Sequence, residues 1–223
     1  MPMRIEIDVF DYLGEIVEQR RGDAQADLIT ALVSAELDGD QLSAPEVMMH
    51  CWSLLVAGNE TTRNAIAGSL EAFAAYPGEW AVMRSKPEWL DSAVTEMLRW
   101  VTPVRYNCRT ALRDVSIAGT KISGGDFVLL LYSAANRDAS AWQDPHRLDV
   151  TRVDSAPHLA FGYGQHGCLG AQLAHLEMRI LFEELSRRYE MAELAGPTRR
   201  QPHSMLNQFL QLPIKLQLST EAR

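Results

Sequence analysis

The segment of residues 161–170, FGYGQHGCLG, constrains the fold of this chain most strongly, because it sets one cysteine on a glycine-rich turn directly before a long amphipathic helix. Glycine accepts backbone angles and close approaches that a side chain would block, so the loop can curl tightly around Cys168. Backbone N–H groups pointing at the sulfur, and the positive end of the following helix dipole, would stabilise a thiolate, which is the form of cysteine that binds metal. The segment therefore predicts that Cys168 is a metal ligand and that Gly170 lets a flat group lie against the first turn of a helix at 170–189.

Five positions of this segment match the pattern FxxGx(R/H)xCxG: Phe161, Gly164, His166, Cys168 and Gly170. This pattern is the haem-binding signature of the cytochrome P450 superfamily, and the chain resembles its bacterial soluble members. The resemblance implies that Cys168 is the axial thiolate ligand of haem b. It also implies that Phe161 shields the sulfur and that His166 reaches a haem propionate, with Gly162 and Gly170 beside the cofactor. A lone cysteine would otherwise be read as a buried structural thiol, but the match at five positions favours a ligand.

A second motif lies in the apolar helix predicted at 44–76, whose middle is interrupted by the polar run GNETT. Four residues share one face of this helix because of their i, i+3, i+4 and i+7 spacing: Ala57, Glu60, Thr61 and Asn64. The run is similar to the AGx(D/E)T segment of the family, which crosses the distal face of the haem. The resemblance implies that Ala57 and Gly58 lie against the cofactor, that Thr61 donates a hydrogen bond during oxygen activation, and that Glu60 relays protons. Without the resemblance, a solvent-facing polar stripe fits these residues equally well.

Glu96 and Arg99, in the segment SAVTEMLRWVTP, stand at i, i+3 on a helix predicted at 88–101. Exposed pairs of this kind are common and contribute only about 0.3–0.5 kcal/mol. The pair resembles the ExxR motif of the family, which is buried there and joined by a later arginine, here Arg152. Leu148 departs from the pattern, because phenylalanine is common at that place. The resemblance implies a scaffolding role, in which charge-assisted hydrogen bonds hold the irregular loop that delivers the cysteine.

The segment 107–138 alternates apolar and β-branched runs with glycine-containing turns, which predicts short strands joined by tight turns. Arg109 in this segment resembles the arginine that binds a haem propionate in the family, a role that suits a guanidinium. A surface arginine is the alternative. Further helices are predicted near 10–20, 25–37 and 79–85, and strands near 190–194 and 208–218. The predicted fold class is mainly α with small β-sheets (α+β), forming a single partial cytochrome P450 domain over residues 1–223.

The formal net charge of −8 argues against nucleic acid and anionic membranes as partners. The apolar stretches around Leu54 and Leu129 are too short to span a bilayer, and the N-terminus has no signal-peptide pattern. Three cysteines without regular spacing indicate a reducing compartment. The composition therefore predicts a cytoplasmic protein.

The resemblance covers the C-terminal half of the family, so we expect the N-terminal portion that roofs the substrate pocket to be missing. It implies a haem-thiolate monooxygenase that inserts one oxygen atom of O2 into a hydrophobic small molecule of terpene, steroid or lipid type. The electrons would come from a ferredoxin or a flavoprotein. The alternative is a non-catalytic haem-binding or vestigial fragment. A cysteine hydrolase using Cys168 and His166 is disfavoured, because residues two apart on a tight loop cannot easily align as nucleophile and base.

Overall fold

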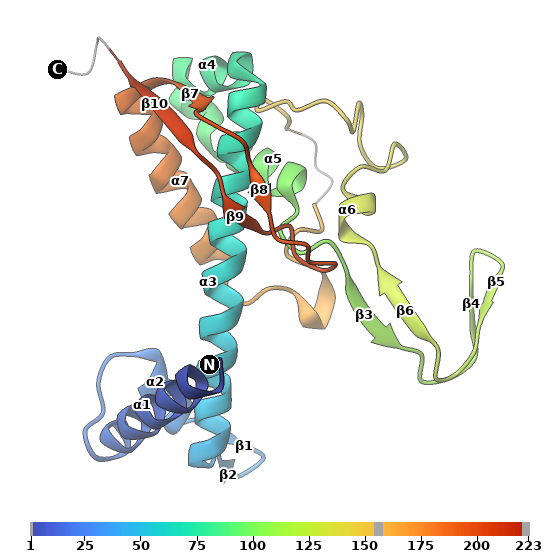
Figure 1. Cartoon of the computed structure of the whole chain (residues 1–223). Coiled ribbons are helices and arrows are strands. Elements are labelled where there is room, and N and C mark those ends of the chain that lie inside the picture. The colour runs from blue at the N-terminus through green and yellow to red at the C-terminus, as the bar shows by residue number, and fades with distance from the viewer. Residues whose placement is uncertain (1, 154–157, 220–223) are drawn as a thin grey trace. The chain divides into compact units, whose positions relative to one another are not determined.

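The computed structural model describes residues 2–153 and 158–219 of the chain, which divides into two compact units, Met1–Asn59 and Glu60–Arg223. Helix α3 (Ala44–Ala75) begins in the first unit and continues into the second (Figure 1). Within the described residues, no helix combines the length and the apolar character needed to cross a membrane. The two units are described separately below.

The first unit contains two helices and a short hairpin before α3: α1 (Pro2–Gly22), α2 (Leu28–Val33), β1 (Glu36–Leu37) and β2 (Asp40–Gln41). Asp27 caps α2 by accepting a hydrogen bond of 2.8 Å from the backbone N–H of Thr30. The helix expected at 25–37 is shorter than predicted, because Asp38 and Gly39 both adopt positive φ and turn the chain into the hairpin. A small apolar core holds this unit together: Leu13, Val17, Val33, Val47 and Cys51.

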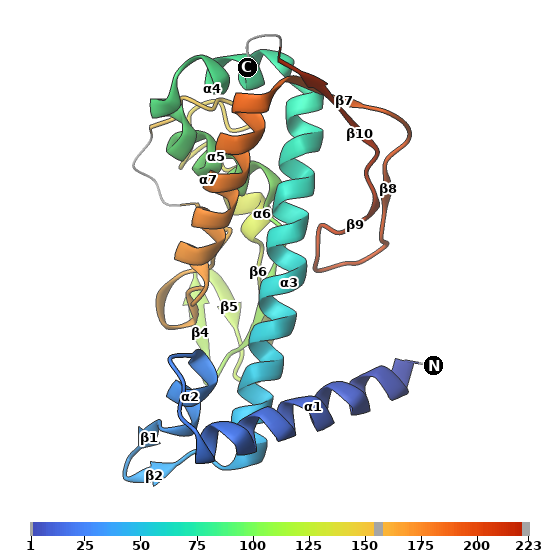
Figure 2. The same ribbon diagram turned by 90° about the vertical axis from the view of Figure 1, so that its left-hand side faces the viewer.

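The second unit is built on helices that follow or continue α3: α4 (Pro77–Ser85), the 3₁₀ turn η1 (Pro87–Trp89), α5 (Leu90–Val101), the short α6 (Tyr132–Ala135) and α7 (Ala171–Arg188). Helix α7 lies beside α3 and α5 in Figure 2. The ring of Phe73 on α3 contacts the rings of Trp80 and Phe182, with centroids 5.2 and 5.6 Å away. These aromatic side chains are at most 1 % exposed and form the centre of the main core.

The sheets of the second unit are four antiparallel pairs (Figure 1). In chain order the strands are β3 (Asn107–Thr110), β4 (Val115–Ile117), β5 (Thr120–Ile122), β6 (Phe127–Leu130), β7 (Tyr189–Leu194), β8 (Arg199–Arg200), β9 (Phe209–Gln211) and β10 (Ile214–Leu218). They pair as β3 with β6, β4 with β5, β7 with β10, and β8 with β9. The predicted fold class, mainly α with small β-sheets, is confirmed.

Helix α7 buries one apolar face and leaves a second apolar stripe exposed. Met178 and Phe182 are fully buried and Leu185 packs beside them. Leu173, Leu176 and Ile180, which lie at i, i+3 and i+7, are instead 61, 49 and 50 % exposed. The described part of the chain therefore leaves an apolar stripe of α7 uncovered.

Candidate functional site

The cysteine loop is shaped by two glycines and by its own backbone hydrogen bonds. Gly162 and Gly164 have φ of 68° and 71°, a left-handed conformation that favours glycine. The N–H of Cys168 donates to the carbonyl of Phe161 at 2.8 Å, and that of Gly167 donates to the carbonyl of Gly164 at 2.9 Å. These two amides close the loop on itself. They do not bind the sulfur, which differs from the expectation that the loop amides point at it.

The thiol of Cys168 is exposed, directly ahead of helix α7. Gly170 is the N-cap of that helix, and a Cβ added at Gly170 would lie 4.0 Å from the sulfur. A β-carbon added at Gly164 would meet nothing within 4 Å. The flanking side chains of Tyr163 and Leu169 are 80 and 84 % exposed. An accessible sulfur with apolar neighbours and glycines around it fits a flat, largely apolar group bound through a central iron.

Behind the loop, Phe161 packs against the main core, and its ring centroid lies 5.5 Å from that of His158. Burial, helped by the electrostatic influence of His175 and Arg99, lowers the pKa of His158 to about 4. The backbone N–H of Ala160 donates to Nδ1 of His158 at 3.2 Å. His158 is therefore a neutral acceptor beneath the loop at neutral pH.

Asn136, for which no site role was predicted, anchors the start of this loop. It is 1 % exposed. Its Oδ1 accepts from the N–H of Leu159 at 2.7 Å, and its Nδ2 donates to Oγ1 of Thr102 at 2.8 Å. Thr102 ends α5 in a left-handed conformation, with φ of 43°. The amide of Asn136 thus joins the end of α5 to the approach of the cysteine loop.

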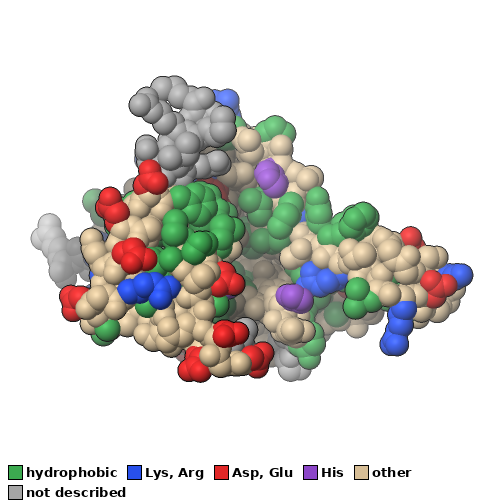
Figure 3. All heavy atoms as spheres, turned by 90° about the horizontal axis from the view of Figure 1, so that it is seen from below, with side chains coloured by type: hydrophobic (Ala, Val, Ile, Leu, Met, Phe, Trp, Pro, Cys, Tyr) green, Lys and Arg blue, Asp and Glu red, His purple; other side chains and the backbone are tan. Residues whose placement is uncertain are grey.

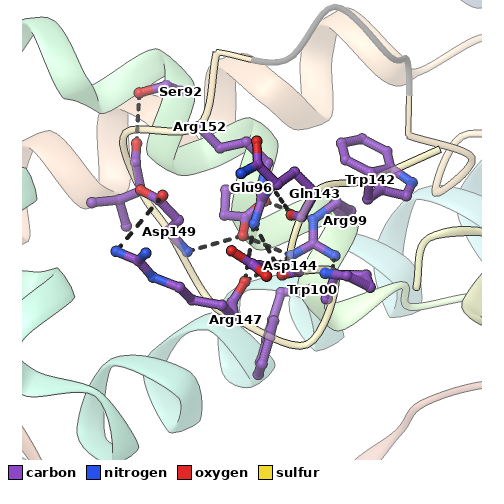
Figure 4. A network of polar contacts seen from close by, with 12 residues as sticks. Ser92, Glu96, Arg99, Trp100, Trp142, Gln143, Asp144, Arg147, Asp149 and Arg152 are labelled. Atoms are coloured by element: carbon purple, nitrogen blue, oxygen red, sulfur yellow. Dashed lines mark hydrogen bonds and ion pairs between the residues drawn. The ribbon is translucent and has the colours of Figure 1, made fainter. Parts of the chain in front are cut away.

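Glu96 and Arg99 form a bidentate ion pair in the interior, with Nε–Oε2 and Nη2–Oε1 distances of 2.7 Å and side chains about 1 % exposed (Figure 4). The backbone N–H of Asp149 donates to Oε1 of Glu96 at 3.0 Å. Nε of Arg152 lies 3.2 Å from Oε2 of Glu96. The structure therefore brings all three predicted scaffold residues together.

Arg99 and Arg152 donate hydrogen bonds to backbone carbonyl groups of the irregular segment that follows α6. Arg99 donates to the carbonyls of Asn136, Pro145 and Arg147 at 2.7, 3.0 and 3.3 Å. Arg152 donates to the carbonyls of residues 143, 144 and 147, its shortest bond being 2.7 Å to residue 143. Carbonyls without a strand or helix partner are satisfied in this way. The network fixes a stretch of chain that has no regular secondary structure.

The residues of the GNETT run and its neighbours lie on α3. Ala57 and Gly58 are exposed and fall in the first unit, whereas Glu60 and Thr61 are partly buried and fall in the second. A Cβ added at Gly58 would meet nothing within 4 Å, so this face of the helix is open. Asn64, one turn beyond Glu60, is 2 % exposed.

Glu60 is not part of an isolated polar stripe, because its Oε2 accepts hydrogen bonds both from residues of α3 and from a residue far along the chain. Oε2 accepts from Nη2 of Arg63 at 2.7 Å, from Nδ2 of Asn64 at 3.4 Å, and from Nε2 of Gln208 at 2.7 Å. Gln208 lies 148 residues away along the chain. Sequence reasoning missed this contact because no local pattern marks it.

Arg109 and His166, the two residues expected to bind the haem propionates, lie on different elements of the structure. Arg109 lies on β3 opposite Val128, is partly buried, and donates from Nη1 to the carbonyl of Cys108 at 2.9 Å. His166 ends the 3₁₀ turn η2 (Gly164–His166) and is exposed. In Figure 3 the part of the second unit that projects to the right, where β3 to β6 lie in Figure 1, carries separate hydrophobic side chains among basic and acidic ones. Phe127 and Leu129 of β6 are 80 and 55 % exposed.

The comparisons with known proteins agree on one family. The family model described as Cytochrome P450 matches residues 81–220. Linalool 8-monooxygenase from Pseudomonas putida is 39% identical over 202 residues, which cover 91% of this chain and 50% of that enzyme. Methyl-branched lipid omega-hydroxylase from Mycobacterium tuberculosis (strain ATCC 25618 / H37Rv) is 41% identical over 210 residues, which cover 93% of this chain and 48% of that enzyme.

Solved structures show the same likeness. The crystal structure of CYP109E1 from Bacillus megaterium in complex with testosterone matches with a TM-score of 0.90 and 30% identity, over 96% of this chain and 60% of that chain. The chain spans about half the length of the curated relatives that it matches. The buried Glu96–Arg99 pair and the loop of Cys168 both lie inside the matched range, which covers more than half of the chain. We conclude that this chain belongs to the cytochrome P450 family.

Proposed function

We propose that this chain is the haem-binding half of a monooxygenase that inserts one oxygen atom of O2 into a hydrophobic small molecule. The observation that carries the proposal is the exposed thiol of Cys168, presented on a glycine-shaped loop at the start of α7. The relatives named above act on linalool and on methyl-branched lipids, and a similar structure holds testosterone. These names support a terpene, steroid or lipid-like substrate.

The proposed roles around the cofactor follow from the chemistry of each side chain. The thiolate of Cys168 holds the iron of haem b, and Phe161 shields the sulfur from water. Arg109 and His166 bind the propionates, since a guanidinium and an imidazole N–H can both donate hydrogen bonds to carboxylates. Gly162 and Gly170 leave the cofactor room beside the loop. When bound, the haem supplies the activation of O2, in a net reaction that consumes two electrons and two protons and yields the hydroxylated product and water.

On the distal side, Ala57 and Gly58 present a small-residue surface on which the cofactor can lie. Thr61 would donate a hydrogen bond from its hydroxyl at the oxygen site, and Glu60 would pass protons through its carboxylate. The contacts with Arg63, Asn64 and Gln208 all engage Oε2 of Glu60.

The continuity of α3 across both units supports one partial P450 domain over residues 1–223. We further propose a ferredoxin or flavoprotein as electron donor, a cytoplasmic location, and no nucleic-acid or membrane partner; the charge of −8 supports the last two points. The second candidate function is a non-catalytic or vestigial haem-binding fragment. It is favoured by the apolar stripe left exposed on α7.

The test is the absorbance of the reduced, CO-bound chain after addition of haem. A thiolate-ligated haem gives a strongly red-shifted main band, and Cys168→Ala abolishes that band because it removes the sulfur. Cys51→Ala and Cys108→Ala are the matched controls and keep the band. A red-shifted band in the Cys168→Ala variant contradicts the assignment. Product formation with O2 and an electron donor then separates the monooxygenase from the vestigial fragment.

A further inference from the structure

The chain around Gln208 is fastened to α3 and α5 on both sides of this residue. The N–H of Phe209 donates to Oδ1 of the buried Asn64 at 3.0 Å. Nδ2 of Asn207 donates to the carbonyl of Val101 at 2.9 Å. The carbonyl of Gln208 itself accepts from the N–H of Gln201 at 3.0 Å. The backbone of residues 207–209 is therefore fixed before the side chain of Gln208 makes any contact.

The side chain of Gln208 then reaches back to α3, where Nε2 donates to Oε2 of Glu60 at 2.7 Å. The other close donor to this oxygen is Arg63, also at 2.7 Å. Arg63 lies on the same helix as Glu60 and its side chain is 55 % exposed, so water competes for its ion pair. Gln208 comes instead from the anchored loop that leads into β9 (Phe209–Gln211).

We propose that Gln208 is a positioning residue for Glu60, and that the segment 205–209 thereby sets the direction in which Oε1, the other carboxylate oxygen, points. The inference rests on the proposed function in one respect, the role of Glu60 in proton transfer. Holding Oε2 from two elements fixes the side-chain torsions of Glu60, which determines the place of Oε1. Displacement of residues 205–209 would release the carboxylate from this orientation.

A double-mutant cycle on the whole chain tests the contact. Glu60→Ala and Gln208→Leu are made singly and together, and the equilibrium constant for unfolding is measured with urea. The two effects should be coupled by about fivefold to tenfold, because each variant removes the same hydrogen bond. The matched control cycle pairs Glu60→Ala with Gln211→Leu, an exposed glutamine at the end of β9, and should be additive within about twofold. An additive Glu60–Gln208 cycle overturns the proposal.

A second measurement tests whether Gln208 positions Glu60 or only makes a structural contact with it. This measurement is the ¹³C resonance of the Glu60 carboxyl carbon in chain labelled at glutamate. The loss of this resonance in Glu60→Gln assigns it. Gln208→Leu should shift it, whereas Gln211→Leu should leave it in place. A resonance that stays in place in Gln208→Leu overturns the proposal. Neither measurement uses haem or turnover, so loss of the CO band would count against the proposed function alone.

Discussion

The side chains of Glu96 and Arg99 are each 1 % exposed, whereas Glu184 and Arg187, a pair with the same i, i+3 spacing, are 39 and 70 % exposed. Arg99→Ala leaves the Glu96 carboxylate buried with less compensation, so the free energy of unfolding should fall by about 3–5 kcal/mol. Arg187→Ala is the matched control and should change it by less than about 0.5 kcal/mol. Urea denaturation measures both. Equal effects would show that the buried network does not support the fold.

His158 should make the stability of the protein depend on pH. Its pKa in the folded chain is about 4 because of burial, whereas an unfolded histidine titrates near about 6.5. The unfolded state therefore takes up a proton first as the pH falls, and stability present above pH ~6.5 is lost toward pH ~4. Between pH 7 and pH 5 the loss should be about 2 kcal/mol.

His158→Gln should flatten this pH dependence, because glutamine can accept the hydrogen bond from Ala160 without titrating. The exposed His146 provides the control, and His146→Gln should keep the slope of the unmodified chain. The measurement is urea denaturation at several pH values between 5 and 7, above the range in which most carboxyl groups titrate. An unchanged slope in His158→Gln would contradict the assignment of a buried neutral imidazole.

The contact between Glu96 and Arg99 was predictable from the sequence because a short motif carries both residues. The role of Cys168 rests on a motif of the same kind and stays a prediction. Asn136 and Gln208 were missed, because their partners lie 23 to 148 residues away along the chain. A hydrogen bond between distant side chains leaves no periodic signal in the sequence.

At the scale of elements, long helices were predicted well because their signals are local. The helix expected at 44–76 is α3 (Ala44–Ala75), and that expected at 88–101 is the turn η1 with α5. The strand expected at 208–218 is instead two strands, β9 and β10, which Leu212 and Pro213 separate. Proline lacks the N–H that a strand ladder needs. The pairing of β7 with β10 joins residues 20 to 29 positions apart along the chain and had no local signal.

Helix α7 offers a comparison between two apolar positions on one element. Leu176 is 49 % exposed, whereas Phe182 is fully buried. Leu176→Lys should change the free energy of unfolding by less than about 0.5 kcal/mol. Phe182→Ala should lower it by about 3–5 kcal/mol, because it opens a cavity in the main core. Chemical denaturation measures both changes, and a large loss in Leu176→Lys would show that this face is covered in solution.

At the scale of the whole molecule, the two units should differ in local stability. Among the side chains that the structure describes, five buried apolar residues form the core of the first unit and fourteen form that of the second. Burial of apolar area is the main source of stability. Amide hydrogen exchange followed by mass spectrometry should therefore show faster exchange in α1 and α2 than in α5 and α7. Similar exchange rates in all four helices would mean that the units open together.

The separation along the chain between Arg99 and the carbonyl groups that it binds predicts which parts of the protein fold first. These acceptors lie 37 to 48 residues beyond Arg99 along the chain. Closing such loops loses chain entropy before any contact compensates for it, so these bonds form later than the helices, which need only local contacts. During refolding, helical circular dichroism should therefore recover before the fluorescence of Trp142, whose ring lies 5.2 Å from the Arg99 guanidinium. Haem added at the start of refolding would meet Cys168 on a loop whose supports are still absent.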